Sequence, residues 1–331
     1  MTPFDDELAT LLALDALEAD EQADAELRMG TFPPGISDTS AALAEGAAVP
    51  PPADLRGKTL AAALSRRPAG RPFDGTVPCE PSEGFDRTIA DVYALLESLT
   101  PSEWNARAHP EHGRVRDLIA HLVGVERLSL RWLDPDDDMP EVHDHVAATR
   151  PVIDELRILA PDELARTWHD AVRAVAAAAA HGDPTRMVSF HDIRTTVPGF
   201  LITRTFELWA HAMDISVATG RPLLRLDPER MATLSNRLMG VVGAALAYRS
   251  ADHPGRSVRF VLTGPAGGSY TVALTPNQEP GVPDATIVAD AYDICRVAAR
   301  RLDPDELPAV IEGDRELAGL VLAGLDSFAR D

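Results

Sequence analysis

The sequence has little cysteine, almost no lysine and few aromatic residues. Its two cysteines are Cys79 and Cys295, Lys58 is the single lysine among 31 basic residues, and aromatic residues make up 5% of the chain. Two cysteines in unrelated contexts build neither a disulfide framework nor a cysteine zinc site. Neither has a histidine nearby in the sequence that would activate its thiol. We therefore expect both cysteines to be chemically inert.

Long hydrophobic runs and a positive net charge are missing too. No stretch approaches the roughly 18–20 apolar residues of a membrane-spanning helix, and the first residues, MTPFDDEL, are acidic where a secretory signal is basic. The 52 acidic and 31 basic residues leave a net charge of −21, which repels phosphate backbones. We expect a cytoplasmic protein that binds neither membranes nor nucleic acid directly, whereas a basic protein partner would suit this charge.

What the sequence does have is the composition of a globular protein, with 45% hydrophobic and 25% charged residues over 331 positions. At roughly 100–200 residues per domain, this length predicts two or three domains. Residues 1–66 are acidic and carry leucines at helical spacing, which predicts a small separable helical module that binds a protein. Residues 67–79 are rich in proline and glycine and are interpreted as a linker.

Residues 80–222 carry four helical patterns. Apolar stripes predict helices over 81–99, 115–133, 161–181 and 199–219. Pro198 suits the start of the last helix and Gly220 its stop. Four helices in succession predict a helical bundle.

Residues 223–331 have a different pattern, because segments typical of strands alternate with segments typical of helices. The patterns predict helices over 227–248, 291–302 and 314–328, and strands over 257–264, 268–275 and 285–290. The first two strands are separated by a short proline- and glycine-containing turn that predicts a hairpin. We expect a small α+β domain.

The strongest chemical signal is the pair Glu207 and His211. Residues four apart on a helix project from one face, so the two side chains could bind one divalent metal. A pair of this kind is more often structural, but His121 lies on the apolar stripe of the helix predicted over 115–133. A histidine on a buried face needs a hydrogen bond or a metal. These three residues therefore form a candidate metal site.

Two further residues could support such a site. Asp214 follows His211 by three positions and could orient it, although a surface or capping role is equally open. Arg301 could act catalytically by holding a substrate carboxylate with its forked guanidinium group, and the alternative is a solvated arginine.

Three segments together resemble one family. VRDLIAHLVGVE, RTFELWAHAMDISVATGRP and the stretch from ADAYDICRVAARRLDPDELP to the C-terminus are similar to mycothiol-dependent maleylpyruvate isomerases, over about residues 80–331. The resemblance implies a mainly α fold: a DinB-like four-helix bundle over 80–222 and a small sterol-carrier-like α+β domain over 223–331. It also implies that His121, Glu207 and His211 bind a divalent metal, usually zinc, to which the thiolate of mycothiol binds.

The resemblance implies a function and has one departure. It suggests a metal- and mycothiol-dependent isomerase or S-transferase that acts on a small electrophilic molecule. Where the family usually has Gly-Trp before its second helix, this chain reads His112-Gly113-Arg114. The change lies near the mouth of the expected site, so it leaves the identity of the substrate open.

The N-terminal segment resembles a second family. LLALDALEADEQADAEL and PPPADLRGKTLAAALSRRP are similar to the N-terminal domain of actinobacterial anti-sigma factors, here without the cysteines of its zinc motif. This implies that an RNA polymerase sigma factor is a possible partner of residues 1–66. The alternative function is therefore a transcriptional regulator that uses the bundle as a metal or thiol sensor or as a scaffold. Catalysis and thiol sensing need the same open metal position, so the sequence leaves both open.

Overall fold

The structure, a computed structural model, describes residues 59, 76–136, 142, 144–190, 193–248 and 253–325. Apart from residue 59, these belong to the compact unit Leu60–Asp331. The module predicted at residues 1–66 lies outside the described residues, except for residue 59, and stays a prediction. The described part is mainly helical and contains a small sheet, as expected.

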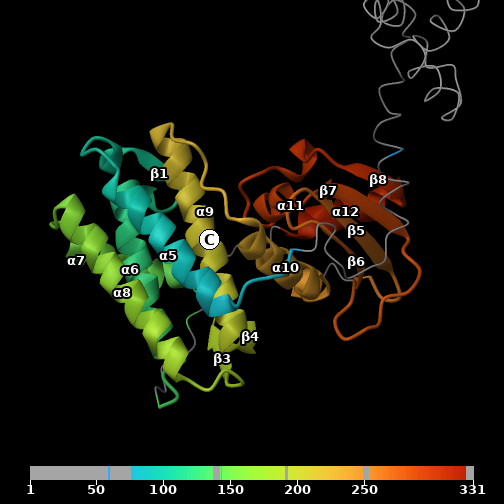
Figure 1. The fold of residues 1–331 in the computed structure, drawn as a ribbon, viewed down its shortest axis with the longest axis horizontal. Coiled ribbons are helices and arrows are strands. Elements are labelled where there is room, and N and C mark those ends of the chain that lie inside the picture. Colours follow the sequence, from blue (N-terminus) through green and yellow to red (C-terminus); the bar gives the residue numbers. More distant parts are fainter. Residues whose placement is uncertain are drawn as a thin grey trace, which may run out of the picture. The chain divides into compact units, whose positions relative to one another are not determined.

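Four long helices lie alongside one another as a bundle, as the sequence predicts (Figure 1). They are α5 (Pro81–Glu97), α6 (Val115–Leu133), α8 (Pro161–His181) and α9 (Val197–Thr219). Three of them begin with a proline in the first two positions, where its missing N–H costs nothing. Helix α9 ends at Gly220, whose φ of 67° suits a residue without Cβ. Among the described residues, no helix is long and apolar enough to cross a membrane.

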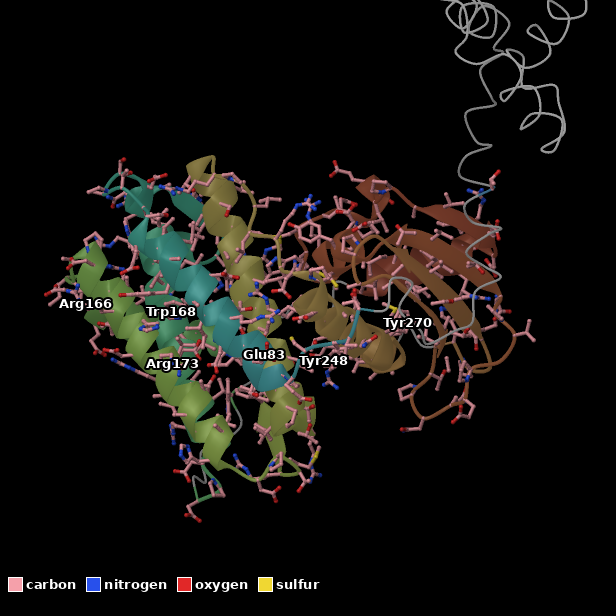
Figure 2. The ribbon with its side chains drawn as sticks, viewed as in Figure 1. Glu83, Arg166, Trp168, Arg173, Tyr248 and Tyr270 are labelled. Atoms are coloured by element: carbon pink, nitrogen blue, oxygen red, sulfur yellow. The ribbon has the colours of Figure 1, made fainter. Side chains whose placement is uncertain are left out.

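The bundle buries one face of each helix. Trp168 on α8 is completely buried, whereas Arg166 and Arg173 on the same helix have half or more of their side chains exposed (Figure 2). Helix α8 is therefore amphipathic in the ordinary sense, with its apolar stripe turned to the core. The apolar residues whose spacing predicted these helices are the ones that pack together in the core of the bundle.

Several short elements were not predicted. They are α7 (His145–Leu156) and the hairpins β1–β2 (Arg107–His109, Gly113–Arg114) and β3–β4 (Met187–Phe190, Ile193–Thr196). A 3-10 turn, η1 (Glu103–Asn105), follows α5. Strands of two to four residues are too short to show an alternating pattern, and α7 contains Pro151, a residue that argues against a helix. The β1–β2 hairpin leads directly into α6 and so shapes the candidate site.

The C-terminal part is a four-stranded sheet with three helices, in agreement with the expected α+β class. Its helices are α10 (Pro228–Tyr248), α11 (Ala291–Ala298) and α12 (Arg315–Gly324), and its strands are β5 (Ser257–Thr263), β6 (Gly268–Ala273), β7 (Ala285–Asp290) and β8 (Val310–Gly313). A 3-10 turn, η2 (Pro304–Glu306), precedes β8. The strand order is β6-β5-β7-β8, with β5 parallel to β7 and the other pairs antiparallel.

Two details of this part differ from the prediction. Strand β8 was not predicted, and α11 ends at Ala298 rather than at residue 302. Helix α11 stops because Arg300 adopts φ 59°, while the backbone N–H groups of Arg300 and Arg301 donate to Val297 and Arg296. This is the hydrogen-bond pattern of a helix end closed by a left-handed residue, normally a glycine.

Helix α9 is shared by two hydrophobic cores. Phe200, Leu208 and Ala212 belong to the core of the bundle. Trp209 and Met213 belong to the core that α10, α11, α12 and the sheet form. A helix that is buried on two sides carries apolar residues on most of its surface.

Two glycines on α10 give a matched test of how this helix packs on the sheet. A Cβ at Gly243 would lie 2.8 Å from the backbone oxygen of Ala273, and backbone cannot yield easily, whereas nothing lies within 4 Å of a Cβ at Gly240. We expect Gly243→Ala to lower the free energy of unfolding by about 1–3 kcal/mol. Gly240→Ala should instead raise it by about 0.5–1 kcal/mol, because alanine has the higher helix propensity. Denaturant unfolding measures both, and equal effects would contradict the close approach.

Candidate metal centre

Five histidines gather where α6, α7, α9 and the β1–β2 hairpin meet: His109, His112, His121, His145 and His211. The rings of His112 and His121 stack with their centroids 3.9 Å apart, and the His211 ring stands nearly perpendicular to both. His112, His121, His145 and His211 are all buried. Buried imidazoles close to one another repel when protonated, and this repulsion contributes to the lowered pKa of His121.

The two histidines that the sequence predicts as metal ligands lie close together in the structure. His121 on α6 and His211 on α9 have ring centroids 6.1 Å apart, and they are 0% and 1% exposed. The Nε2 atom of each is buried and has no hydrogen-bond partner. An unsatisfied buried nitrogen is costly, so both positions call for a ligand atom or a metal ion.

The hydroxyl of Thr149 fixes the tautomer of His121. This hydroxyl donates to the carbonyl of Val146 at 3.0 Å, so it accepts from Nδ1–H of His121, 2.8 Å away. Gly124 makes room for this contact, since a Cβ there would lie 2.7 Å from the Thr149 side chain. Burial, followed by the neighbouring imidazoles, holds the pKa of His121 well below its ordinary value. His121 is therefore neutral and presents the lone pair of Nε2.

A carboxylate fixes His211 in the same tautomer. Nδ1–H of His211 donates to Asp214 Oδ2 at 3.0 Å, and two nitrogens of Arg301 donate to the two oxygens of Asp214. Burial raises the pKa of Asp214, but the bonds from His211 and Arg301 outweigh it and lower the pKa overall. A histidine held by a carboxylate through one nitrogen is the common arrangement of metal-binding histidines.

Arg301 reaches Asp214 because of how α11 ends. The left-handed turn at Arg300 directs the next residue toward α9, and Arg301 also donates to the carbonyl of Ala299. From the sequence, Arg301 was predicted to bind a carboxylate of the substrate. In the structure Arg301 pairs with the carboxylate of Asp214, and the Arg301 side chain is 11% exposed. Arg301 therefore acts on the cluster through Asp214, and its predicted contact with substrate stays a prediction.

Glu207, the third residue of the predicted set, has a different partner. One guanidinium nitrogen of Arg204 donates to Glu207 and another to Glu126. Arg204 and Glu126 are 1% and 0% exposed. Burial raises the pKa of Glu126 to about 7, an effect that Arg204 opposes and Glu207 increases. Arg204 is therefore paired with two carboxyl groups, those of Glu207 and Glu126.

His112 also lies beside His121 and His211, with its ring stacked on that of His121. Among the described residues, the candidate metal-binding group with all ligand atoms within 4.8 Å of one another consists of His112, His121 and His211. Sequence reasoning noticed His112 only as a departure from a family pattern. The signal that could have found it is its place directly before α6, the helix that carries His121.

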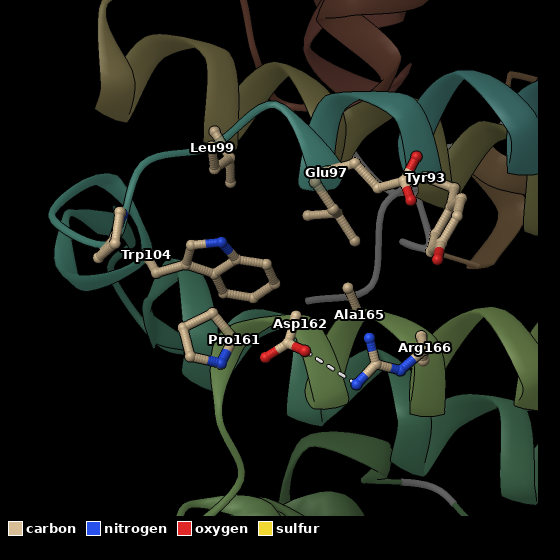
Figure 3. Close-up of a pocket in the computed structure, with 10 residues that line it drawn as sticks. Tyr93, Glu97, Leu99, Trp104, Pro161, Asp162, Ala165 and Arg166 are labelled. Atoms are coloured by element: carbon tan, nitrogen blue, oxygen red, sulfur yellow. Dashed lines mark hydrogen bonds and ion pairs between the residues drawn. The ribbon is translucent and has the colours of Figure 1, made fainter.

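A separate cavity lies on another side of the bundle. It has a volume of about 400 Å³ and lies between the end of α5, η1 and the start of α8, where Trp104, Glu97 and Asp162 line it (Figure 3). Asp162 is already paired with Arg166 at 2.8 Å. None of the five histidines lines this cavity, so it is not the pocket of the candidate centre.

Glu126 predicts a pH dependence of stability. Its pKa of about 7 in the folded state exceeds its unfolded value, so the folded state binds more protons between about pH 4.5 and pH 7. The contribution of Glu126 to stability is therefore present below this window and is lost as the pH rises through it, by about 3 kcal/mol at most. Glu126→Gln should remove this part of the slope in urea unfolding measured across the window; an unchanged slope would contradict the raised pKa.

One comparison with known protein families agrees with the resemblance seen in the sequence. Residues 85–216 match the family described as the mycothiol maleylpyruvate isomerase N-terminal domain. Among solved structures, the chain is similar to the mycothiol-dependent maleylpyruvate isomerase, with 18% identity, 70% of this chain and 91% of that chain covered, and a TM-score of 0.49. A point mutant of that enzyme gives 17% identity with the same coverage and TM-score. Curated protein sequences give no match. The matched segment, α5 to most of α9, contains His112, His121 and His211.

Proposed function

We propose that this protein is a metal- and mycothiol-dependent enzyme, an isomerase or S-transferase that acts on a small electrophilic molecule. The observation that carries the proposal is the pair of buried Nε2 atoms on His121 and His211, each on a ring whose Nδ1 is already fixed. The similarity of residues 85–216 to the mycothiol maleylpyruvate isomerase N-terminal domain supports mycothiol as the thiol. Maleylpyruvate or a related electrophile is the natural first substrate to test.

The chemistry of the donor set suits a divalent metal, with zinc as the first candidate. Neutral imidazole nitrogens are good zinc ligands, and three protein ligands leave a fourth position open in catalytic zinc sites. Glu207 is proposed as the third ligand, as the sequence predicts, and His112 is an alternative because its ring nitrogens lie close to those of His121 and His211. A metal bound there would supply a positively charged open position that stabilises a thiolate at neutral pH.

The thiol has to come from a small molecule, because the chain's own cysteines are unsuited to the task. Cys295 is completely buried on α11, and burial raises the pKa of its thiol to about 12. Cys79 lies beside Thr233, with the sulfur 3.5 Å from the hydroxyl oxygen. Neither belongs to the histidine cluster. This supports a cofactor that brings its own sulfur.

When bound, mycothiol would supply a thiolate nucleophile for an electrophilic carbon of the substrate, either reversibly, as in an isomerase, or with displacement of a leaving group, as in an S-transferase. The protein's residues position the thiolate: Thr149, Asp214 and Arg301 hold the two histidine rings, and the buried cluster excludes water.

The finer parts of the prediction are retained as proposals. The bundle is proposed to be DinB-like, and residues 223–331 to be a sterol-carrier-like domain that acts on the centre through Arg301. A sigma factor as partner of residues 1–66 would add regulation, and it rests on the sequence resemblance alone.

Replacing His211 tests the proposed function directly. Two remaining ligands seldom retain zinc, so His211→Ala should lose stoichiometric metal after dialysis and all mycothiol-dependent conversion of maleylpyruvate. Circular dichroism should show nearly unchanged helical content. Metal analysis of the wild-type protein is the control, and it should find one equivalent of zinc. A wild-type protein that takes up no metal, or a variant that keeps a full equivalent, would overturn the proposal.

Arg301 and Asp214 should act as positioning residues. We expect Arg301→Met and Asp214→Asn each to weaken metal affinity about 10–100-fold, because the orientation of His211 is lost. Arg300→Gly is the matched control, since glycine keeps the left-handed turn; its affinity should stay at the wild-type value. If Arg301→Met instead leaves metal affinity unchanged and raises KM for a carboxylate substrate, then Arg301 contacts the substrate directly.

A further inference from the structure

We propose that the cavity between the end of α5, η1 and the start of α8 is a second binding site, for a small organic cation that has an apolar body and one hydrogen-bond acceptor. Amino-acid amides and amino alcohols are compounds of this class. None of the histidines of the candidate metal centre lines the cavity. The proposal is therefore independent of the proposed function of that centre.

The cavity has the size and the lining of a small-molecule site. Its volume of about 400 Å³ lies within the usual range of ligand pockets. Leu96, Leu99 and Ala165 are buried and form apolar walls, and the exposed residues Glu97 and Asp162 add two carboxylates. Figure 3 shows the α5 side and the α8 side of the cavity facing each other. Apolar walls with a few polar groups are the usual composition of such sites.

The group that most clearly calls for a ligand is the indole N–H of Trp104, at one end of the cavity. Trp104 is only 3% exposed, and its Nε1 atom forms no hydrogen bond within the part of the chain that the structure describes. Figure 3 shows this nitrogen on the edge of the ring that faces Leu99 and the end of α5. Buried tryptophans usually have an acceptor for this N–H. A ligand oxygen in the cavity would supply one.

Trp104 is held in place by the residue before it. Arg221, just after α9, donates to both carboxylate oxygens of Glu103, at 2.8 Å and 3.0 Å. The backbone N–H and the hydroxyl of Thr100 donate to the same carboxylate. The bonds from Arg221, followed by those from Thr100, lower the pKa of Glu103 to about 2. The turn η1 is thus fixed before a ligand arrives, which reduces the entropy lost on binding.

The charges at the cavity favour a cation. Asp162 is paired with Arg166 at 2.8 Å, as the dashed line in Figure 3 shows. Glu97 forms no ion pair with any of the described residues. It lies near the hydroxyl of Tyr93, whose pKa is raised by burial and then by Glu97. Two carboxylates and one guanidinium group leave one negative charge in excess, and that charge attracts a positively charged ligand.

One ligand chemistry satisfies all of these groups together. A protonated amine pairs with Glu97, an oxygen acceptor on a neighbouring carbon receives the N–H of Trp104, and an apolar group packs against Leu96, Leu99 and Ala165. Hydrogen bonds between ionised partners are the strong ones, so the amine should contribute most of the affinity. The acceptor and the apolar group then select among amines.

Three related compounds test the ligand class on the full chain. Phenylalaninamide has the amine and the acceptor, 2-phenylethylamine lacks the acceptor, and N-acetylphenylalaninamide lacks the charge. The chain has four tryptophans, so the indole N–H signals in a ¹⁵N-correlated NMR spectrum are few, and Trp104→Phe assigns the signal of Trp104. At about pH 6.5 the amine is protonated. Phenylalaninamide should then shift the Trp104 signal saturably, with a Kd on the order of 1 mM for a ligand of this size. The other two compounds should each bind about 10-fold more weakly or worse.

Variants of the chain identify the contacts, with calorimetry as the measurement. Glu97→Gln should weaken phenylalaninamide about 10-fold or more and leave the weak binding of N-acetylphenylalaninamide unchanged. Glu83→Gln makes the same change on α5 outside the cavity and should bind phenylalaninamide normally. Trp104→Phe should bind phenylalaninamide and 2-phenylethylamine equally, because the N–H that distinguishes them is gone.

Thermal unfolding verifies the fold of each variant. Glu97 is exposed, so Glu97→Gln keeps the test valid even where Trp104→Phe does not fold. The inference is overturned by a Trp104 signal that phenylalaninamide does not shift saturably, by equal binding of the uncharged compound, or by equal losses in Glu97→Gln and Glu83→Gln. None of these results affects the metal centre, whose own test is metal binding by the wild-type protein and His211→Ala.

Discussion

The candidate centre depends on one constraint: α9 is packed between two hydrophobic cores. Its Leu208 and Ala212 face the bundle, and its Trp209 and Met213 face the core of the C-terminal part. A buried polar residue on such a helix is not solvated, so it needs a hydrogen-bond or ion-pair partner within the protein. Arg204 finds it in Glu126, and His211 finds it in Asp214. The site's geometry follows from satisfying these few groups on a shared helix.

The shared helix also explains why two parts of the chain act on one side chain. His211 lies with its ring among the histidines of α6 and the β1–β2 hairpin, while Asp214, one turn later, is held by Arg301 of the C-terminal part. Residues three and four apart lie on neighbouring positions of a helix surface. A single turn of α9 therefore connects the two cores. The C-terminal part orients His211 through Arg301 and Asp214 and adds no residue to the histidine cluster.

The sequence predicts long helices well, because burying one face of a helix requires apolar residues at a regular spacing over many positions. The bounds of α6 and α8 were predicted as the structure has them. His121 was identified from its place on the apolar stripe of α6, and His211 from its spacing to Glu207 on α9. The hairpin that carries His112 was not predicted, since three residues and two residues show no periodicity. The interaction of Arg204 with Glu126 could not be predicted either. Arg204 and Glu207 are three residues apart on one helix, but Glu126 lies 78 positions before Arg204 in the sequence, and no spacing pattern connects the two. Arg301 was found, but its partner could not be, because the αL turn at Arg300 uses a residue type that gives no turn signal.

The balance of charge around α9 connects these observations. Arg204 is paired with Glu126 and Glu207, and Arg301 is paired with Asp214, so the charged groups on α9 and against it hold one another in place. Burial keeps the pKa of His121 low, and Nδ1 of that ring is already bonded to Thr149. These interactions leave the buried Nε2 atoms of His121 and His211 without a hydrogen-bond partner, so a divalent ion at the proposed centre would satisfy polar atoms that α6 and α9 bring together.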